Sequence, residues 1–136
     1  MQNIVKIKKV LDSISSLTSE YKQCSNLDHA GQLNKNITSA KKQLLDTYTP
    51  EVSKRFSNLD AKLHSLLKEH FTSLVLAIGD LQQVHTTKIN AQHVDPNVLH
   101  NLLLTHIHPI IKQIDSRLLA MHATLQGISV VAKRNP

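Results

Sequence analysis

The chain has 136 residues, of which 40% are apolar and 19% charged, and its formal net charge is +6. These shares are typical of a globular protein and argue against an intrinsically disordered chain, so we expect a single domain over residues 1–136. An aromatic share of only 3% argues against a stacking platform for single-stranded nucleic acid, and three glycines leave little material for phosphate-binding loops.

Two apolar stripes with helical spacing predict helices over about 2–24 and 28–48. At about 100° per residue, the second stripe lies roughly 150° away from the first around a shared axis. Supercoil drift of about 20° per heptad cannot produce this offset. We therefore predict a break near Ser25, where Ser25-Asn26-Leu27-Asp28 is close to a capping box, with one bent helix as the alternative.

A third stripe predicts one long helix over 50–91. It begins at Thr49-Pro50, an N-cap followed by proline at the first helical position, and it ends before Asp95-Pro96, which repeats that signal. Such a helix would be roughly 60 Å long at about 1.5 Å per residue, which is typical of an elongated bundle or coiled coil. The stripe consists of Val52, Phe56, Leu59, Leu63, Leu67, Phe71, Leu74, Ile78, Leu81, His85 and Ile89.

The last stripe predicts a helix over about 96–132. Pro109 lies inside this helix and removes a backbone hydrogen bond, so we expect a kink at 105–109 or a helix restart. Because only a few residues connect successive helices, neighbours must run antiparallel. The predicted fold is therefore all-α: an elongated antiparallel bundle of four helices, in which the third and fourth form a long hairpin and the fourth is kinked near Pro109.

Several apolar residues lie beside the principal stripes. The segment Leu74–Ile78 is apolar all the way round its helix, and three further residues widen the stripe of the fourth helix beyond what a simple bundle requires. Helices of about 20 residues also cannot cover a hairpin twice their length unless they spread along it. We therefore predict a non-enzymatic interaction module, such as an adaptor, a chaperone-like partner or an assembly subunit, that binds itself or another protein. The predicted interface consists of Val75, Leu76, Leu104, Ile111 and Leu119.

An alternative is a basic helical protein that binds nucleic acid or anionic membrane surfaces through its ends. The positive charge is spread almost evenly over the four predicted helices, whereas nucleic-acid binders usually concentrate it on one face or in a tail. Solvated lysines on a core helix explain the same pattern, so we favour the interaction module. The predicted polyanion contacts are Lys6, Lys8, Lys9, Lys133 and Arg134.

No motif predicts an enzyme, a cofactor or a small-molecule substrate. Successive histidines among the nine are never three or four residues apart, the spacing that places two metal ligands together on a helix. His106 and His108 lie on nearly opposite sides of a helix and could converge only if the turn before Pro109 unwinds. Cys24 lies on the apolar side of its helix, so we expect a buried small hydrophobe and not a nucleophile.

The sequence also bears on location. The first residues, Met1 to Val10, are not followed by the apolar segment of a signal peptide, and the longest wholly apolar run is too short to cross a bilayer. We expect a cytoplasmic protein, although export by a signal-independent system would leave no mark in the sequence. No motif is specific enough to indicate a known family.

Overall fold

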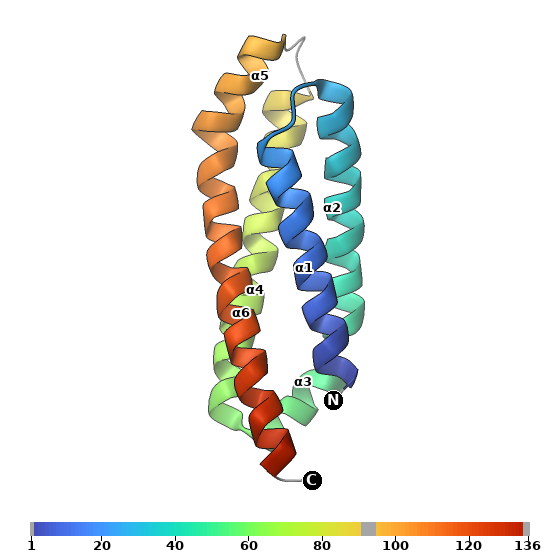
Figure 1. Cartoon of the computed structure of the whole chain (residues 1–136), viewed down its shortest axis with the longest axis vertical. Coiled ribbons are helices and arrows are strands. Elements are labelled where there is room, and N and C mark those ends of the chain that lie inside the picture. The colour runs from blue at the N-terminus through green and yellow to red at the C-terminus, as the bar shows by residue number, and fades with distance from the viewer. Residues whose placement is uncertain (1, 91–94, 135–136) are drawn as a thin grey trace.

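A computed structural model describes residues 2–90 and 95–134, and within these ranges almost the whole chain is helical. In chain order the described elements are α1 (Gln2–Lys22), α2 (Leu27–Thr47), α3 (Pro50–Leu59), α4 (Ala61–Val84), η1 (His85–Ile89), α5 (Pro96–Leu102), η2 (Leu103–Ile107) and α6 (His108–Arg134). The long rods α1, α2, α4–η1 and α5–η2–α6 lie side by side around a common core (Figure 1). α1 contacts α2 and α6, and α4 also contacts α2 and α6, so the rods close into a ring. Successive rods alternate in direction, which confirms the predicted all-α antiparallel bundle.

The first two rods are separate helices, as the offset between their stripes predicts. α1 ends at Lys22, and Asn26 starts α2 by accepting a hydrogen bond on its side-chain oxygen from the backbone N–H of His29 at 2.8 Å. The break is therefore confirmed, and the capping residue is Asn26, one position after the serine at which we placed it. Cys24 is buried in this connection, as expected. The alternative of one bent helix is excluded.

The prediction of one helix over 50–91 is wrong at Asp60. This residue has extended backbone dihedrals, φ −160° and ψ 104°, and it separates α3 from α4. Its carboxylate accepts hydrogen bonds from the backbone N–H groups of Lys62 and Leu63, both at 3.0 Å, and so caps α4. The apolar stripe continues across the break because Leu59 and Leu63 both pack against the core. The predicted end of the helix at residue 91 lies outside the described residues.

The break at Asp60 lets α3 cover one end of the bundle. In Figure 1, α4 and α6 extend past the end of α2, and α3 lies across this extension. α3 contacts both α4 and α6 and buries Val52 and Phe56. The ring of Tyr48 lies 6.1 Å from that of Phe56 and 4.7 Å from that of Phe71, between ring centres. A short fifth helix therefore covers the part of the long hairpin that α2 does not reach.

Two turns of π-helix interrupt the long rods, η1 after α4 and η2 between α5 and α6. Pro109 explains η2, because proline has no N–H to donate and its ring clashes with the carbonyl group four residues earlier. The chain widens before Pro109, and the N–H of His108 bonds to the carbonyl of Leu103, five residues back. The interruption that we predicted near Pro109 is thus confirmed as a π turn over 103–107. Asp95 caps the start of this rod by accepting from the N–H of Val98 at 2.9 Å.

Candidate interaction surfaces

The five predicted interface residues do not share one environment. Leu119 is 74% exposed, Leu76 65% and Leu104 47%, whereas Val75 is only partly exposed. Ile111 is 1% exposed and belongs to the core, so its assignment to the interface is wrong. The physical reason is that α6 packs against both α4 and α1, which requires a wider apolar arc than contact with a single neighbour.

The two most exposed leucines lie in two shallow grooves, one along each side of α6. Leu76 lines the α4–α6 groove, of about 380 Å³, together with Arg117 of α6. Leu119 lines the α1–α6 groove, of about 420 Å³. Leu104 belongs to η2 and lines neither groove. The α4–α6 groove is lined by Ser73, Leu76, Ala77, Asp80, Gln113, Ser116 and Arg117, and the α1–α6 groove by Asp12, Ser15, Ser19, Lys22, Asp115, Leu118, Leu119 and His122.

Each groove has a polar rim around its leucine. In the α4–α6 groove, the Nη1 of Arg117 lies 2.9 Å from the Nδ1 of His70, which holds the guanidinium against α4. In the α1–α6 groove, the Nε2 of His122 lies 3.1 Å from a carboxylate oxygen of Asp12. An apolar side chain surrounded by hydrogen-bonding groups is the arrangement found at the centre and rim of protein interfaces.

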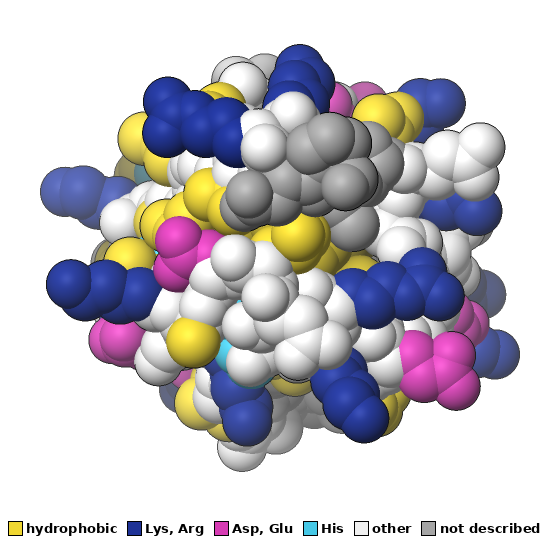
Figure 2. All heavy atoms as spheres, turned by 90° about the horizontal axis from the view of Figure 1, so that it is seen from below, with side chains coloured by type: hydrophobic (Ala, Val, Ile, Leu, Met, Phe, Trp, Pro, Cys, Tyr) yellow, Lys and Arg dark blue, Asp and Glu magenta, His cyan; other side chains and the backbone are white. Residues whose placement is uncertain are grey.

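The predicted polyanion contacts come together in space. Because the helices alternate in direction, the start of α1 and the end of α6 lie at the same end of the bundle (Figure 1). α3 and the first turn of α4 lie at this end too, and Figure 2 shows the Lys and Arg side chains that surround it. Lys54, Arg55 and Lys62 were not among the predicted contacts. We call the following set the basic pole: Lys6, Lys8, Lys9, Lys54, Arg55, Lys62, Lys133 and Arg134.

The basic pole accounts for the entire formal net charge of the chain. The segments 2–10, 48–62 and 127–134 contain these eight cations and two acidic residues, Glu51 and Asp60, so their balance equals the +6 of the whole chain. Among the described residues, the ion pair within bonding distance joins His122 to Asp12, so no cation of the pole is paired with a carboxylate. Positive charge is spread almost evenly along the sequence, so the sequence alone does not predict its concentration at one end of the bundle. The concentration arises only when the antiparallel helices bring distant segments together.

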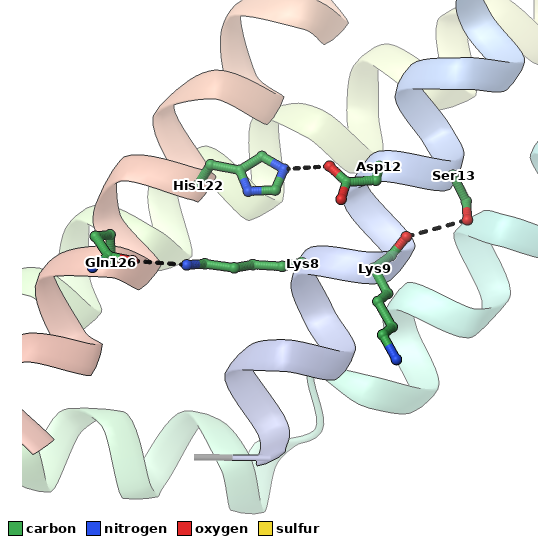
Figure 3. Close-up of polar contacts among 6 residues, drawn as sticks. All are labelled: Lys8, Lys9, Asp12, Ser13, His122 and Gln126. Atoms are coloured by element: carbon green, nitrogen blue, oxygen red, sulfur yellow. Dashed lines mark hydrogen bonds and ion pairs between the residues drawn. The ribbon is translucent and has the colours of Figure 1, made fainter. Parts of the chain in front are cut away.

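One lysine of the pole is engaged and its neighbour is not. Lys8 points from α1 toward α6 and donates to the side-chain oxygen of Gln126 at 2.9 Å, one level below the His122–Asp12 contact (Figure 3). Lys9 points away from α6 (Figure 3) and is exposed, as is Lys6. α1 therefore uses one lysine to contact α6 and presents two others to solvent.

A buried contact between two side chains joins Tyr21 of α1 to His85 of η1. The hydroxyl of Tyr21 lies 2.6 Å from the Nδ1 of His85, and the two rings meet edge to face with their centres 5.8 Å apart. Burial lowers the pKa of His85; burial, followed by the neighbouring Cys24, raises the pKa of Tyr21. Both groups are thus held neutral, which allows the tyrosine O–H to donate to the imidazole nitrogen. The pair joins two rods at the point where the α-helical ladder of α4 gives way to a π turn.

A serine and a histidine also lie close together at the Asp60 break. The hydroxyl of Ser53 in α3 is 2.6 Å from the Nε2 of His64 in α4. In nucleophilic catalysis by such a pair, a third group commonly orients the histidine. Within residues 2–90 and 95–134, the Nδ1 of His64 makes no hydrogen bond that could serve this purpose. The contact instead ties α3 to α4 across their connection.

The histidines near Pro109 do not form a metal site with other residues in the described part of the chain. The Nε2 of His108 lies 3.3 Å from the carbonyl oxygen of Lys22, so the ring joins α6 to the end of α1. His106 is only partly exposed. No group of three His, Cys, Asp or Glu residues among those described is arranged to hold a metal ion. His93 lies outside the described residues.

Comparison with protein-family models, curated protein sequences and solved structures finds no match to this chain. Among its described helices, none has the length and apolar character needed to span a bilayer.

Proposed function

We propose that this chain is a non-enzymatic helical interaction module, located in the cytoplasm, which binds a second copy of itself or another protein along the two edges of α6. The observation that carries the proposal is the exposure of Leu76 and Leu119, each in a groove beside that helix. Isolated exposed leucines are common on protein surfaces. Leu76 and Leu119 differ from such isolated leucines because they lie on the two sides of one helix, each within a polar rim. A partner that lies along α6 could cover both of them.

The energetic gain from covering these leucines is substantial. Complete burial of a leucine contributes roughly 1.5–3 kcal/mol, so covering the exposed parts of both would contribute roughly 2–4 kcal/mol. Such a contribution is comparable with that of a small cluster of interface hot spots. The grooves are shallow, so the proposed partner is a helix or another convex protein surface and not a small molecule.

The proposal is tested with the double variant Leu76→Glu/Leu119→Glu. Both side chains point to solvent, so the variant is expected to retain the helical circular dichroism and thermal midpoint of the wild type. Light scattering after size exclusion shows whether the wild type self-associates, and quantitative affinity purification from the native cell identifies a different partner. We expect the variant to lose the dimer or the partner.

A matched control replaces Ala123, which is exposed on the same helix and lines neither groove, with glutamate. This control adds a charge to α6 and leaves both exposed leucines and the linings of both grooves intact. The proposal is wrong if two results are found together. The first is a monomeric wild type, and the second is recovery of the same proteins in the same amounts by the wild type, the control and the double variant.

A further inference from the structure

We propose that the basic pole binds the surface of an anionic phospholipid bilayer. The pole shares no residue with the linings of the two grooves beside α6, so the inference does not depend on the proposed protein partner. It rests on three features of the pole: the concentration of unpaired cations, the apolar side chains among them, and the absence of aromatic groups that could stack on bases.

The charge of the pole is concentrated and available. Four elements contribute to it, and the segments that form it contain eight cations and only two acidic residues. One of those acids, Asp60, is engaged with backbone N–H groups at the start of α4. The remainder of the chain has equal numbers of basic and acidic residues, so the molecule is strongly polarised along its long axis. Near a negatively charged surface, the electric field turns such a molecule so that this end faces the surface.

Apolar side chains lie among the cations of the pole. Val5 is 52% exposed and forms a shallow hollow with Gln2, Lys6 and Lys9. Val130, near the end of α6, is exposed as well. Hydrophobic side chains are also visible between the Lys and Arg side chains in Figure 2. Lysines beside exposed apolar groups suit the boundary between lipid headgroups and acyl chains, where the amine contacts phosphate and the apolar group leaves water.

The same features disfavour nucleic acid as the occupant. Single-strand binders stack bases on aromatic faces, but Tyr21, Tyr48 and Phe56 are buried and Phe71 is partly buried against the core. The hollow at Val5 includes only Lys6 and Lys9 of the pole, and no groove among the described residues connects the remaining cations, whereas a duplex-binding surface has to track a phosphate backbone. Apolar groups such as Val5 would gain nothing from contact with phosphates.

The chain lacks tryptophan, which provides a direct test of which face meets the bilayer. Val5→Trp places one fluorophore in the pole, and Leu119→Trp places one in the α1–α6 groove. We expect a blue shift in the emission of Val5→Trp when vesicles of phosphatidylcholine and phosphatidylserine are added, and none with phosphatidylcholine alone. Leu119→Trp should not shift with either. A shift of Leu119→Trp without one of Val5→Trp would overturn the proposal.

Charge neutralisation supplies a second readout with a matched control. Each Lys or Arg that reaches an anionic surface raises partitioning about fivefold, so Lys6→Gln/Lys9→Gln should weaken binding to serine-containing vesicles about 25-fold. Lys35→Gln/Lys88→Gln removes the same charge from exposed positions outside the pole and should change binding much less. Raised salt should release the wild type from vesicles.

Three outcomes would overturn the proposal: no sedimentation of the wild type with serine-containing vesicles, equal loss of binding in both double variants, or displacement of the protein from vesicles by a short duplex DNA that it binds more tightly. The last result would assign the basic pole to nucleic acid.

Discussion

The buried contact between Tyr21 and His85 provides a sharp test of the packing of α1 against the π turn. Tyr21→Phe keeps the ring and its edge-to-face contact with His85 but removes the hydroxyl that lies 2.6 Å from Nδ1. The imidazole nitrogen is then left buried without a donor. Leaving one buried polar group unsatisfied costs about 1–3 kcal/mol. For a chain of this length, we expect the thermal midpoint to fall by about 4–12 °C.

Urea denaturation at pH 7.5, followed by far-ultraviolet circular dichroism, measures this loss. Tyr48→Phe is a matched control, because the hydroxyl of Tyr48 is also buried and lies near Ser53 but makes no hydrogen bond of good geometry to a described residue. Removing that hydroxyl should leave the free energy of unfolding unchanged or raise it slightly. A double-mutant cycle with His85→Leu should also show strong non-additivity, since Tyr21→Phe/His85→Leu leaves no unpaired polar group. If Tyr21→Phe costs no more than Tyr48→Phe, the hydrogen bond to His85 does not stabilise the fold.

Three further predictions concern stability. Burial lowers the pKa of His85 below its ordinary value of 6.5, so the unfolded chain binds a proton at this residue more readily than the folded chain does. The free energy of unfolding should therefore fall as pH falls below about 6.5. His85→Leu should flatten this part of the pH profile in urea titrations. A Cβ at Gly79 would meet nothing within 4 Å, so Gly79→Ala should raise the free energy of unfolding by about 0.5–1 kcal/mol. At Gly127 a Cβ would lie 3.2 Å from Leu63, so the gain from Gly127→Ala should be smaller. Equal gains in thermal unfolding would show that Leu63 moves freely. Asp60→Ala should cost about 1 kcal/mol through loss of the cap of α4, and an unchanged urea midpoint would show that another group caps the helix.

The ends of most helices could be predicted from local residues. Thr49-Pro50 and Asp95-Pro96 both start helices as the sequence indicates, because an oxygen-bearing side chain followed by proline satisfies the first turn without tertiary help. The break at Asp60 could not be found from periodicity, since Leu59 and Leu63 remain in phase although the helix axis changes direction. The available signal was Asp60 itself, a good N-cap residue and a poor helix former.

Less of the candidate surfaces could be predicted from the sequence. The assignment of Ile111 failed because a wide apolar stripe has the same pattern whether it serves a second neighbour within the fold or an external partner. Lys54, Arg55 and Lys62 were missed as members of the basic pole because they lie far in sequence from both termini. An even number of antiparallel rods does bring the two ends of the chain together, so the meeting of Lys6 with Lys133 follows from the predicted topology.

The proposal that the edges of α6 bind another protein is tested most directly by the amount of protein that this chain recovers from native cells. The wild type, Leu119→Glu and the control Ala123→Glu are each purified from native cells under identical conditions. The molar ratio of recovered protein to bait is then determined, and a second copy of the chain is counted as a recovered protein. We expect a defined ratio for the wild type and Ala123→Glu, and a large loss for Leu119→Glu at unchanged thermal stability. Equal ratios for all three proteins would contradict the proposal.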